Sequence, residues 1–175
     1  MAIAPRAAKG GDPLSGTQEP RLHGVETRFA ELGLTLPEIA PFPSGQEPRL
    51  EPVREHAGLA YLSGIGPIGV AGTVGADLDV EAGYRAARDT ALLAFRRIVD
   101  AYGTLDAVAR WVKVLGFVRS APGFGQQPAV LNGFSDLVID VYGVERGRCA
   151  RSAIGVSELP MNIPVEVEAI VELRS

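Results

Sequence analysis

One long amphipathic helix constrains this chain more than any other feature of its sequence. Apolar side chains recur at three- and four-residue spacing between Val80 and Tyr102, which is the period of one helical face. Asp79 stands where an N-cap residue is expected, and Gly103 stands where a left-handed glycine ends a helix. The pattern therefore predicts a long helix, capped at both ends, with one apolar face.

Two further helices are predicted. One begins at Pro128, a residue that suits the first helical turn because the N–H that it lacks would have no partner there. Its apolar side carries Val130, Leu131, Phe134, Leu137, Val138 and Val141. The other is short and runs from Gly24 to Leu32, before Gly33.

Five strands are predicted from runs rich in Val, Ile and aromatic residues and from alternating positions. They cover residues 50–54, 59–63, 108–118, 151–157 and Val165–Leu173, with turns at 56–58 and 159–162. We therefore expect an α+β fold in which both long helices pack on one face of a sheet. We divide the chain into a flexible N-terminal tail at 1–22, a helix and connector at 23–44, and a main domain at 45–175.

Composition excludes several classes of function. The net charge of -4 and the pI near 5.2 argue against a nucleic-acid partner, which needs clustered Lys and Arg. No apolar run is long enough to span a membrane, and the N-terminus lacks a secretion signal, so we expect a cytoplasmic protein with no membrane partner. Cys149 is the single cysteine, and with His23 and His56 alone it builds neither a disulfide nor a zinc site. We therefore expect no metal and no cofactor.

Two apparent motifs have simpler explanations. Residues 64–69 spell G-x-G-x-x-G, but a dinucleotide site needs that loop to open directly into a helix, and Pro67 with the following glycines postpones any helix to Asp79. We interpret this stretch as a loop. Cys149 lies near Arg151, which favours a lower thiol pKa, but a lone cysteine is more often a small apolar filler than a nucleophile. The two histidines are expected to be solvated loop residues.

The last two predicted strands carry the most informative polar residues. If these strands form a hairpin, Arg151 lies on the same face as Glu166, Glu168 and Glu172. Such a face is too polar for a dry core, so it is either solvated or part of a subunit interface. Arg151 and Glu166 would then form a structural ion pair, or a site in which the arginine grips a carboxylate and the glutamate holds a water.

Several segments resemble the RidA/YjgF family of reactive-intermediate (imine) deaminases. They are Tyr61-Leu62-Ser63-Gly64, residues 111–118, and Ala150-Arg151-Ser152-Ala153 followed by Glu158-Leu159-Pro160 and residues 165–170. The resemblance covers roughly residues 45–175 in unbroken order, and residues 25–38 look like the N-terminal extension of a longer branch of that family.

The resemblance implies a chorismate-mutase-like fold with one mixed sheet, assembled as a homotrimer with ligand clefts between neighbouring subunits. It also implies hydrolysis of enamines and imines such as 2-aminoacrylate to a 2-keto acid and ammonia. Arg151 matches the arginine that binds the substrate carboxylate, and Glu166 matches the glutamate that positions water. Ser63, Asn132, Phe117 and the main chain of Ala153 match cleft residues.

Three positions depart from the family pattern, and each loses a polar or soft contact of the cleft. Leu50 stands where the deaminases often have a tyrosine, Ile65 where they often have a glutamine, and Ala153 where they have a cysteine. Leu50 and Ile65 make the cleft more apolar and favour an alternative, a non-catalytic trimeric binding module for a small carboxylate or a more apolar metabolite. Ribonuclease activity, which is attached to the family by name, is disfavoured by the acidic pI and by the lack of a catalytic histidine pair.

Overall fold

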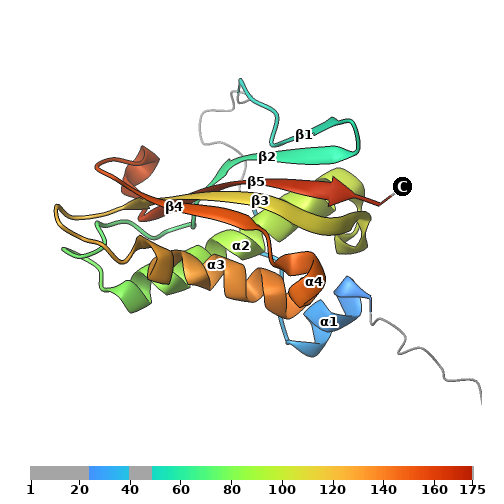
Figure 1. Cartoon of the computed structure of the whole chain (residues 1–175), viewed down its shortest axis with the longest axis horizontal. Coiled ribbons are helices and arrows are strands. Elements are labelled where there is room, and N and C mark those ends of the chain that lie inside the picture. Colours follow the sequence, from blue (N-terminus) through green and yellow to red (C-terminus); the bar gives the residue numbers. More distant parts are fainter. Residues whose placement is uncertain (1–23, 40–48, 175) are drawn as a thin grey trace, which may run out of the picture.

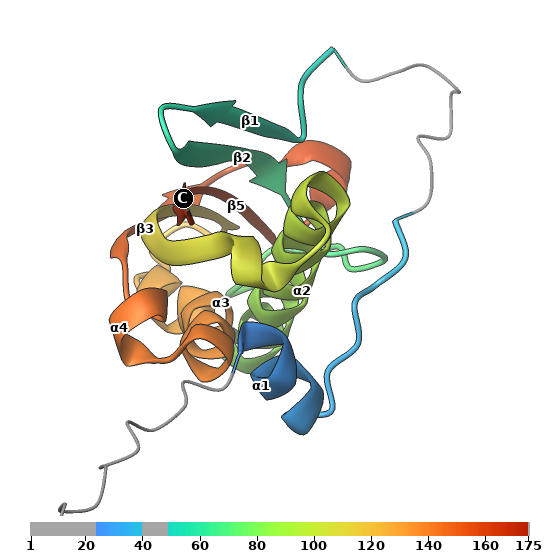
Figure 2. The same cartoon turned by 90° about the vertical axis from the view of Figure 1, so that its right-hand side faces the viewer.

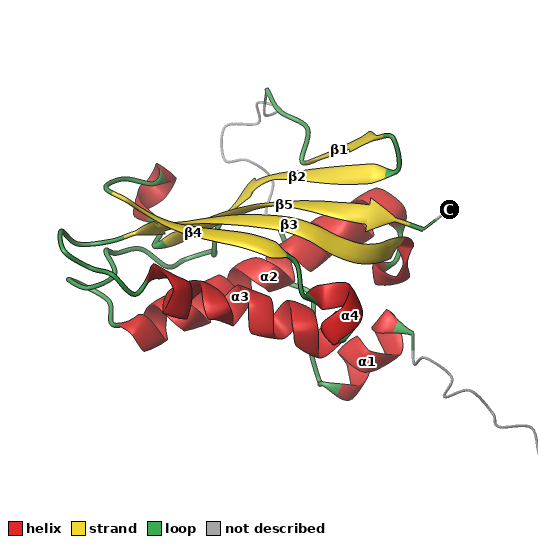
Figure 3. Cartoon of the chain, in the orientation of Figure 1, coloured by secondary structure: helices red, strands yellow, loops and turns green. Residues whose placement is uncertain are grey.

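The computed structural model describes residues 24–39 and 49–174, which form a sheet with helices on one side (Figure 1, Figure 3). The helices are α1 (Val25–Glu31), α2 (Val80–Tyr102), α3 (Gln127–Tyr142) and α4 (Val144–Gly147), with 3-10 turns η1 (Leu105–Ala107) and η2 (Pro160–Asn162). The strands are β1 (Val53–His56), β2 (Leu59–Ile65), β3 (Val108–Arg119), β4 (Ala150–Val156) and β5 (Val165–Leu173). The predicted tail at 1–22 and part of the predicted connector lie outside the described residues.

The caps of α2 are those that the sequence predicts. The Asp79 side chain accepts a hydrogen bond from the Ala82 N–H at 2.7 Å, and Gly103 ends the helix at a φ of +78°. Because both ends are fixed by local chemistry, the predicted and observed bounds of this helix coincide.

Helix α3 packs unusually close to α2 because of a glycine. A Cβ at Gly133 would lie 2.0 Å from the Tyr84 carbonyl oxygen, so only glycine permits this approach. Across the same contact, the Tyr84 hydroxyl donates to Asp136 Oδ2 at 2.9 Å. The two long helices therefore form one closely packed layer, and the prediction that both cover one face of the sheet is confirmed (Figure 2).

The sheet is mixed and has the strand order β1-β2-β5-β3-β4. Strands β3 and β4 run parallel and are joined through α3, whereas every other neighbouring pair is antiparallel. The predicted turn after β1 is present, with positive φ at Ala57 and Gly58, as a tight hairpin requires. Strand β1 begins later than predicted, after Pro52, which has no N–H to donate to a ladder.

The predicted hairpin between the last two strands is wrong. β4 and β5 are not neighbours, since β3 lies between them and pairs with both. Arg151 is level with Val114, which is buried beneath the helices, so Arg151 lies on the helix-covered face. The opposite, open face carries Glu166, Glu168 and Glu172 as predicted, but not Arg151.

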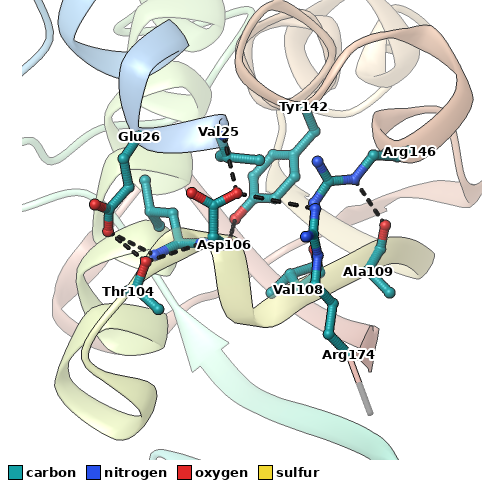
Figure 4. Close-up of polar contacts among 10 residues, drawn as sticks. Val25, Glu26, Thr104, Asp106, Val108, Ala109, Tyr142, Arg146 and Arg174 are labelled. Atoms are coloured by element: carbon teal, nitrogen blue, oxygen red, sulfur yellow. Dashed lines mark hydrogen bonds and ion pairs between the residues drawn. The ribbon is translucent and has the colours of Figure 1, made fainter. Parts of the chain in front are cut away.

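Helix α1 is joined to the rest of the fold near η1 (Figure 4). The Val25 N–H donates to Asp106 Oδ1 at 3.0 Å, and Glu26 Oε1 accepts from the Leu105 N–H at 3.3 Å. The side chain of Val25 is buried, and Phe29 meets the core ring of Phe95 edge-on at 6.2 Å. The predicted N-terminal helix is confirmed, and it is part of the core.

Candidate active site

Arg151 lies on the edge strand β4 and points towards α3. Its Nη1 donates to Asn132 Oδ1 at 3.0 Å and to Ser135 Oγ at 2.9 Å. The three residues lie at a pocket of about 220 Å³, which Cys149 and Ile139 also line. A guanidinium held at one nitrogen still offers N–H groups in a planar fork, the geometry that binds a carboxylate.

Cys149 lines this pocket, and its thiol is not activated as a nucleophile. Burial raises the pKa of its thiol, and the nearby Arg151 cation offsets only part of that effect. The thiol therefore stays protonated at neutral pH. Ala153 follows Arg151 on the same face of β4, so its main chain lies at the same edge of the sheet.

Glu166 lies on the open face of the sheet. It alternates with the buried Val165 and Val167 on β5 and is level with Phe117 on β3. A Cβ at Gly64 would come within 2.2 Å of Glu166 Oε1, so the carboxylate lies against the bare backbone of β2 at that glycine.

The environment of Glu166 makes it a stronger base than an ordinary glutamate. Burial raises the pKa of its carboxyl group, and the neighbouring Glu168 carboxylate raises it further. A carboxylate with a raised pKa holds a proton more readily near neutral pH, which suits a group that orients water.

The remaining predicted site residues, Ser63, Leu50 and Ile65, lie in three different parts of the structure. Ser63 lines a hollow of about 300 Å³ on the open face with Tyr61 and Lys113, and its hydroxyl donates to the Glu51 carbonyl at 2.7 Å. Leu50 is 55% exposed in the segment before β1. Ile65 is level with Val167 and packs against the core on the other face of the sheet.

Within one chain, Arg151 and Glu166 are too far apart for a shared ligand or an ion pair. They occupy strands separated by β3, are three positions out of register and face opposite sides of the sheet. Strand spacing and rise place their Cα atoms about 14 Å apart. The prediction that they share one face is therefore wrong, and so is the structural ion pair.

Ser135 is a hydrogen-bond partner of Arg151 that the sequence prediction missed. It follows Asn132 by three residues on α3, so the two side chains lie on the same side of the helix. This spacing was the available signal.

Within residues 24–39 and 49–174, no three His, Cys, Asp or Glu side chains gather as a metal site requires. No helix of that same part of the chain is long and apolar enough to cross a membrane.

One family model matches most of the chain. A family model described as Endoribonuclease L-PSP matches residues 47–173. Protein TCP17 of Trypanosoma cruzi is 48% identical over 104 residues, which cover 59% of this chain and 65% of that relative. The match thus spans less than two thirds of the length of the relative.

Solved structures share the fold. The protein Atu1372 of Agrobacterium tumefaciens, whose function is unknown, is 39% identical with a TM-score of 0.76; the match covers 86% of this chain and 92% of that one. TdcF of Escherichia coli, crystallised with bound serine, is 22% identical with a TM-score of 0.51, and the match covers 75% of this chain and 92% of that one. At this identity the likeness to TdcF shows the fold alone.

Proposed function

This chain belongs to the Endoribonuclease L-PSP (YjgF/RidA) family, and on that basis we propose that it is a hydrolytic deaminase of small enamines and imines. A 2-aminoacrylate-like enamine tautomerises to its imine, water adds to the C=N carbon, and the C–N bond breaks to release ammonia and a 2-keto acid. The observation that carries this proposal is the Arg151 guanidinium, held at one nitrogen by Asn132 and Ser135 beside a small pocket. The serine bound to TdcF supports a small carboxylate as the ligand.

The separation of Arg151 and Glu166 dictates how such a site would be built. A ligand of three or four carbons cannot span about 14 Å and the thickness of the sheet. We therefore propose a homotrimer in which Arg151 of one copy binds the carboxylate and Glu166 of the neighbouring copy positions the water. The open face of the sheet, with its three glutamates and the half-buried Phe117, supports a subunit interface there.

This arrangement needs no covalent step by the protein. The imine carbon is already electrophilic, so holding the carboxylate and one water supplies orientation, which contributes several kcal/mol in favourable cases. The raised pKa of Glu166 supports its part, because the carboxylate accepts a hydrogen bond from the attacking water and can take its proton.

Complementation between inactive variants tests the shared site. Arg151→Ala and Glu166→Gln should each abolish the accelerated loss of imine in an amino-acid-oxidase mixture. In mixed oligomers made from equal amounts of the two variants, about one quarter of the sites would draw both intact residues from neighbouring copies. We expect activity to return to about that fraction of the wild-type rate.

The matched control is a mixture of Arg151→Ala with the double variant Arg151→Ala/Glu166→Gln, which contains no intact site and should stay inactive. Full activity of Arg151→Ala alone would refute the role of the arginine. If mixed oligomers form by native mass spectrometry but stay inactive, the site is not shared between copies.

A binding module is the second candidate, and two observations favour it. The apolar side chain of Leu50 is largely exposed. The adjacent Glu51 carbonyl already accepts the hydrogen bond that the Ser63 hydroxyl can donate, so this proton is not free for a reacting group. A non-catalytic protein would bind 2-keto acids in calorimetry with the same dependence on Arg151 but would leave the rate of imine loss unchanged.

A further inference from the structure

Two acceptors on α3 hold the same nitrogen of the Arg151 guanidinium. Asn132 Oδ1 and Ser135 Oγ lie 3.0 and 2.9 Å from Nη1, so both N–H groups of that nitrogen have a partner. Over the described ranges, Nε and Nη2 of Arg151 have neither a hydrogen bond nor an ion pair. These two nitrogens form the edge that grips a carboxylate with two parallel hydrogen bonds.

We infer that Ser135 is a positioning residue: it fixes the guanidinium plane so that the Nε–Nη2 edge faces the ligand carboxylate. This inference rests on the proposed function, since it assumes that Arg151 binds a carboxylate. With Asn132 as the sole acceptor, the guanidinium could still swing about that single hydrogen bond. A second acceptor one helical turn away removes this freedom before the ligand arrives, so less side-chain entropy is lost on binding.

Ser135 stands on a closely packed helix, as positioning requires. Ser135 follows Gly133 on α3, where the close approach to Tyr84 locks the two long helices together. The Ser135 side chain is half-buried, and the pocket that it lines with Arg151 is small, at about 220 Å³. A side chain on a packed helix holds its partner more precisely than one on a loop.

A double-mutant cycle on ligand affinity tests this role without relying on turnover. The probe is pyruvate, the 2-keto acid expected from 2-aminoacrylate, and its Kd is measured by calorimetry or NMR titration. One net hydrogen bond corresponds to about a three- to tenfold change in affinity, so Ser135→Ala should raise the pyruvate Kd by about that factor. In an Arg151→Lys background, the same substitution should change the Kd by less than about twofold, because the guanidinium that it orients is gone.

Two further variants and one ligand analogue serve as controls for this affinity measurement. Ser135→Thr keeps the hydroxyl and should bind pyruvate like the wild type. Pyruvamide, which has no carboxylate, should bind equally to Ser135→Ala and to the wild type. Ser152→Ala is the matched control, because Ser152 is adjacent to Arg151 in sequence but accepts a hydrogen bond from Lys113 Nζ at 3.0 Å on the opposite face.

The inference is overturned if Ser135→Ala binds pyruvate like the wild type, or if it raises the Kd equally in the Arg151→Lys background or for pyruvamide. A different result separates it from the proposed function. If Arg151→Ala leaves the pyruvate Kd unchanged, Arg151 is no carboxylate site and the proposed function itself fails. Thermal unfolding of each variant checks that the fold is intact.

Discussion

Replacing Gly64 with alanine should displace the Glu166 carboxylate while leaving the fold intact. The new Cβ would lie 2.2 Å from Oε1 and 3.0 Å from Cδ of Glu166, whereas non-bonded heavy atoms rest about 3.5 Å apart. The carboxylate must therefore move by more than about 1 Å. Gly64 is not among the glycines with positive φ, so alanine fits the backbone conformation there.

The cost to stability should be small because the obstacle is the far end of a flexible side chain. Turning Glu166 into a less favourable rotamer costs about 0.5–1.5 kcal/mol. For a chain of this length, that corresponds to a fall in Tm of about 1–6 °C. The effect on imine hydrolysis should be larger, because misplacing a catalytic group by about 1 Å can cost about a hundredfold in rate.

Calorimetric melting and the imine-loss assay, run on the same preparation, test this prediction. Gly125→Ala is the control, since a Cβ there meets nothing within 4 Å and should change neither quantity. In a Glu166→Ala background the collision is absent, so the fall in Tm caused by Gly64→Ala should disappear. A Gly64→Ala protein with the wild-type rate would refute the placement of Glu166 in the site. A fall in Tm well beyond the expected range would mean that the backbone moves instead.

Three further perturbations follow from contacts described above. Asp106→Ala removes the acceptor of the Val25 N–H, so the free energy of unfolding in a urea titration should fall by about 1–2 kcal/mol; an unchanged midpoint would contradict the docking of α1. Gly133→Ala drives a Cβ into the Tyr84 backbone, where neither helix can yield cheaply, and should cost about 3 kcal/mol or more in the same titration, unlike Gly125→Ala. The raised pKa of Glu166 means that its carboxyl group binds a proton more tightly in the folded protein than in the unfolded chain. The ionised carboxylate therefore destabilises the fold at a pH above its folded pKa. This destabilisation is absent at a pH below the usual value of 4.5, where the group is protonated in both states. Glu166→Gln should therefore unfold at higher urea concentration than the wild type at pH 8, and the difference should vanish on acidification below that value; a constant difference would contradict the shift.

Helix α2 could be predicted from the sequence to the residue because its period and both caps are local signals. The pairing of β4 could not. Strands that follow each other closely in sequence are usually neighbours, and that expectation placed β4 beside β5. In the structure β4 instead runs parallel to β3, a pairing that needs the α3 crossover. The alternation in β4 showed that Arg151 and Ala153 share a face, but alternation does not say which face the helices cover.

The same limit applies to the site. Arg151 and Asn132 could be named from the resemblance, but their hydrogen bond depends on how α3 crosses the edge of the sheet. Ser135 lacks a recognisable motif, and only its spacing from Asn132 on a helix points to it. The separation of Arg151 from Glu166 depends entirely on strand order, which is a long-range property of the chain.

The packing of α1 means that the family unit and the folding unit of this protein have different lengths. The family model begins at residue 47, yet Val25 is only 1% exposed and Phe29 lies against the core ring of Phe95. A shortened protein that began at the family boundary would open this part of the core to water and remove the partners of Asp106 and Leu105. The family model thus matches from residue 47 onwards, whereas the packed core of this chain begins at residue 25.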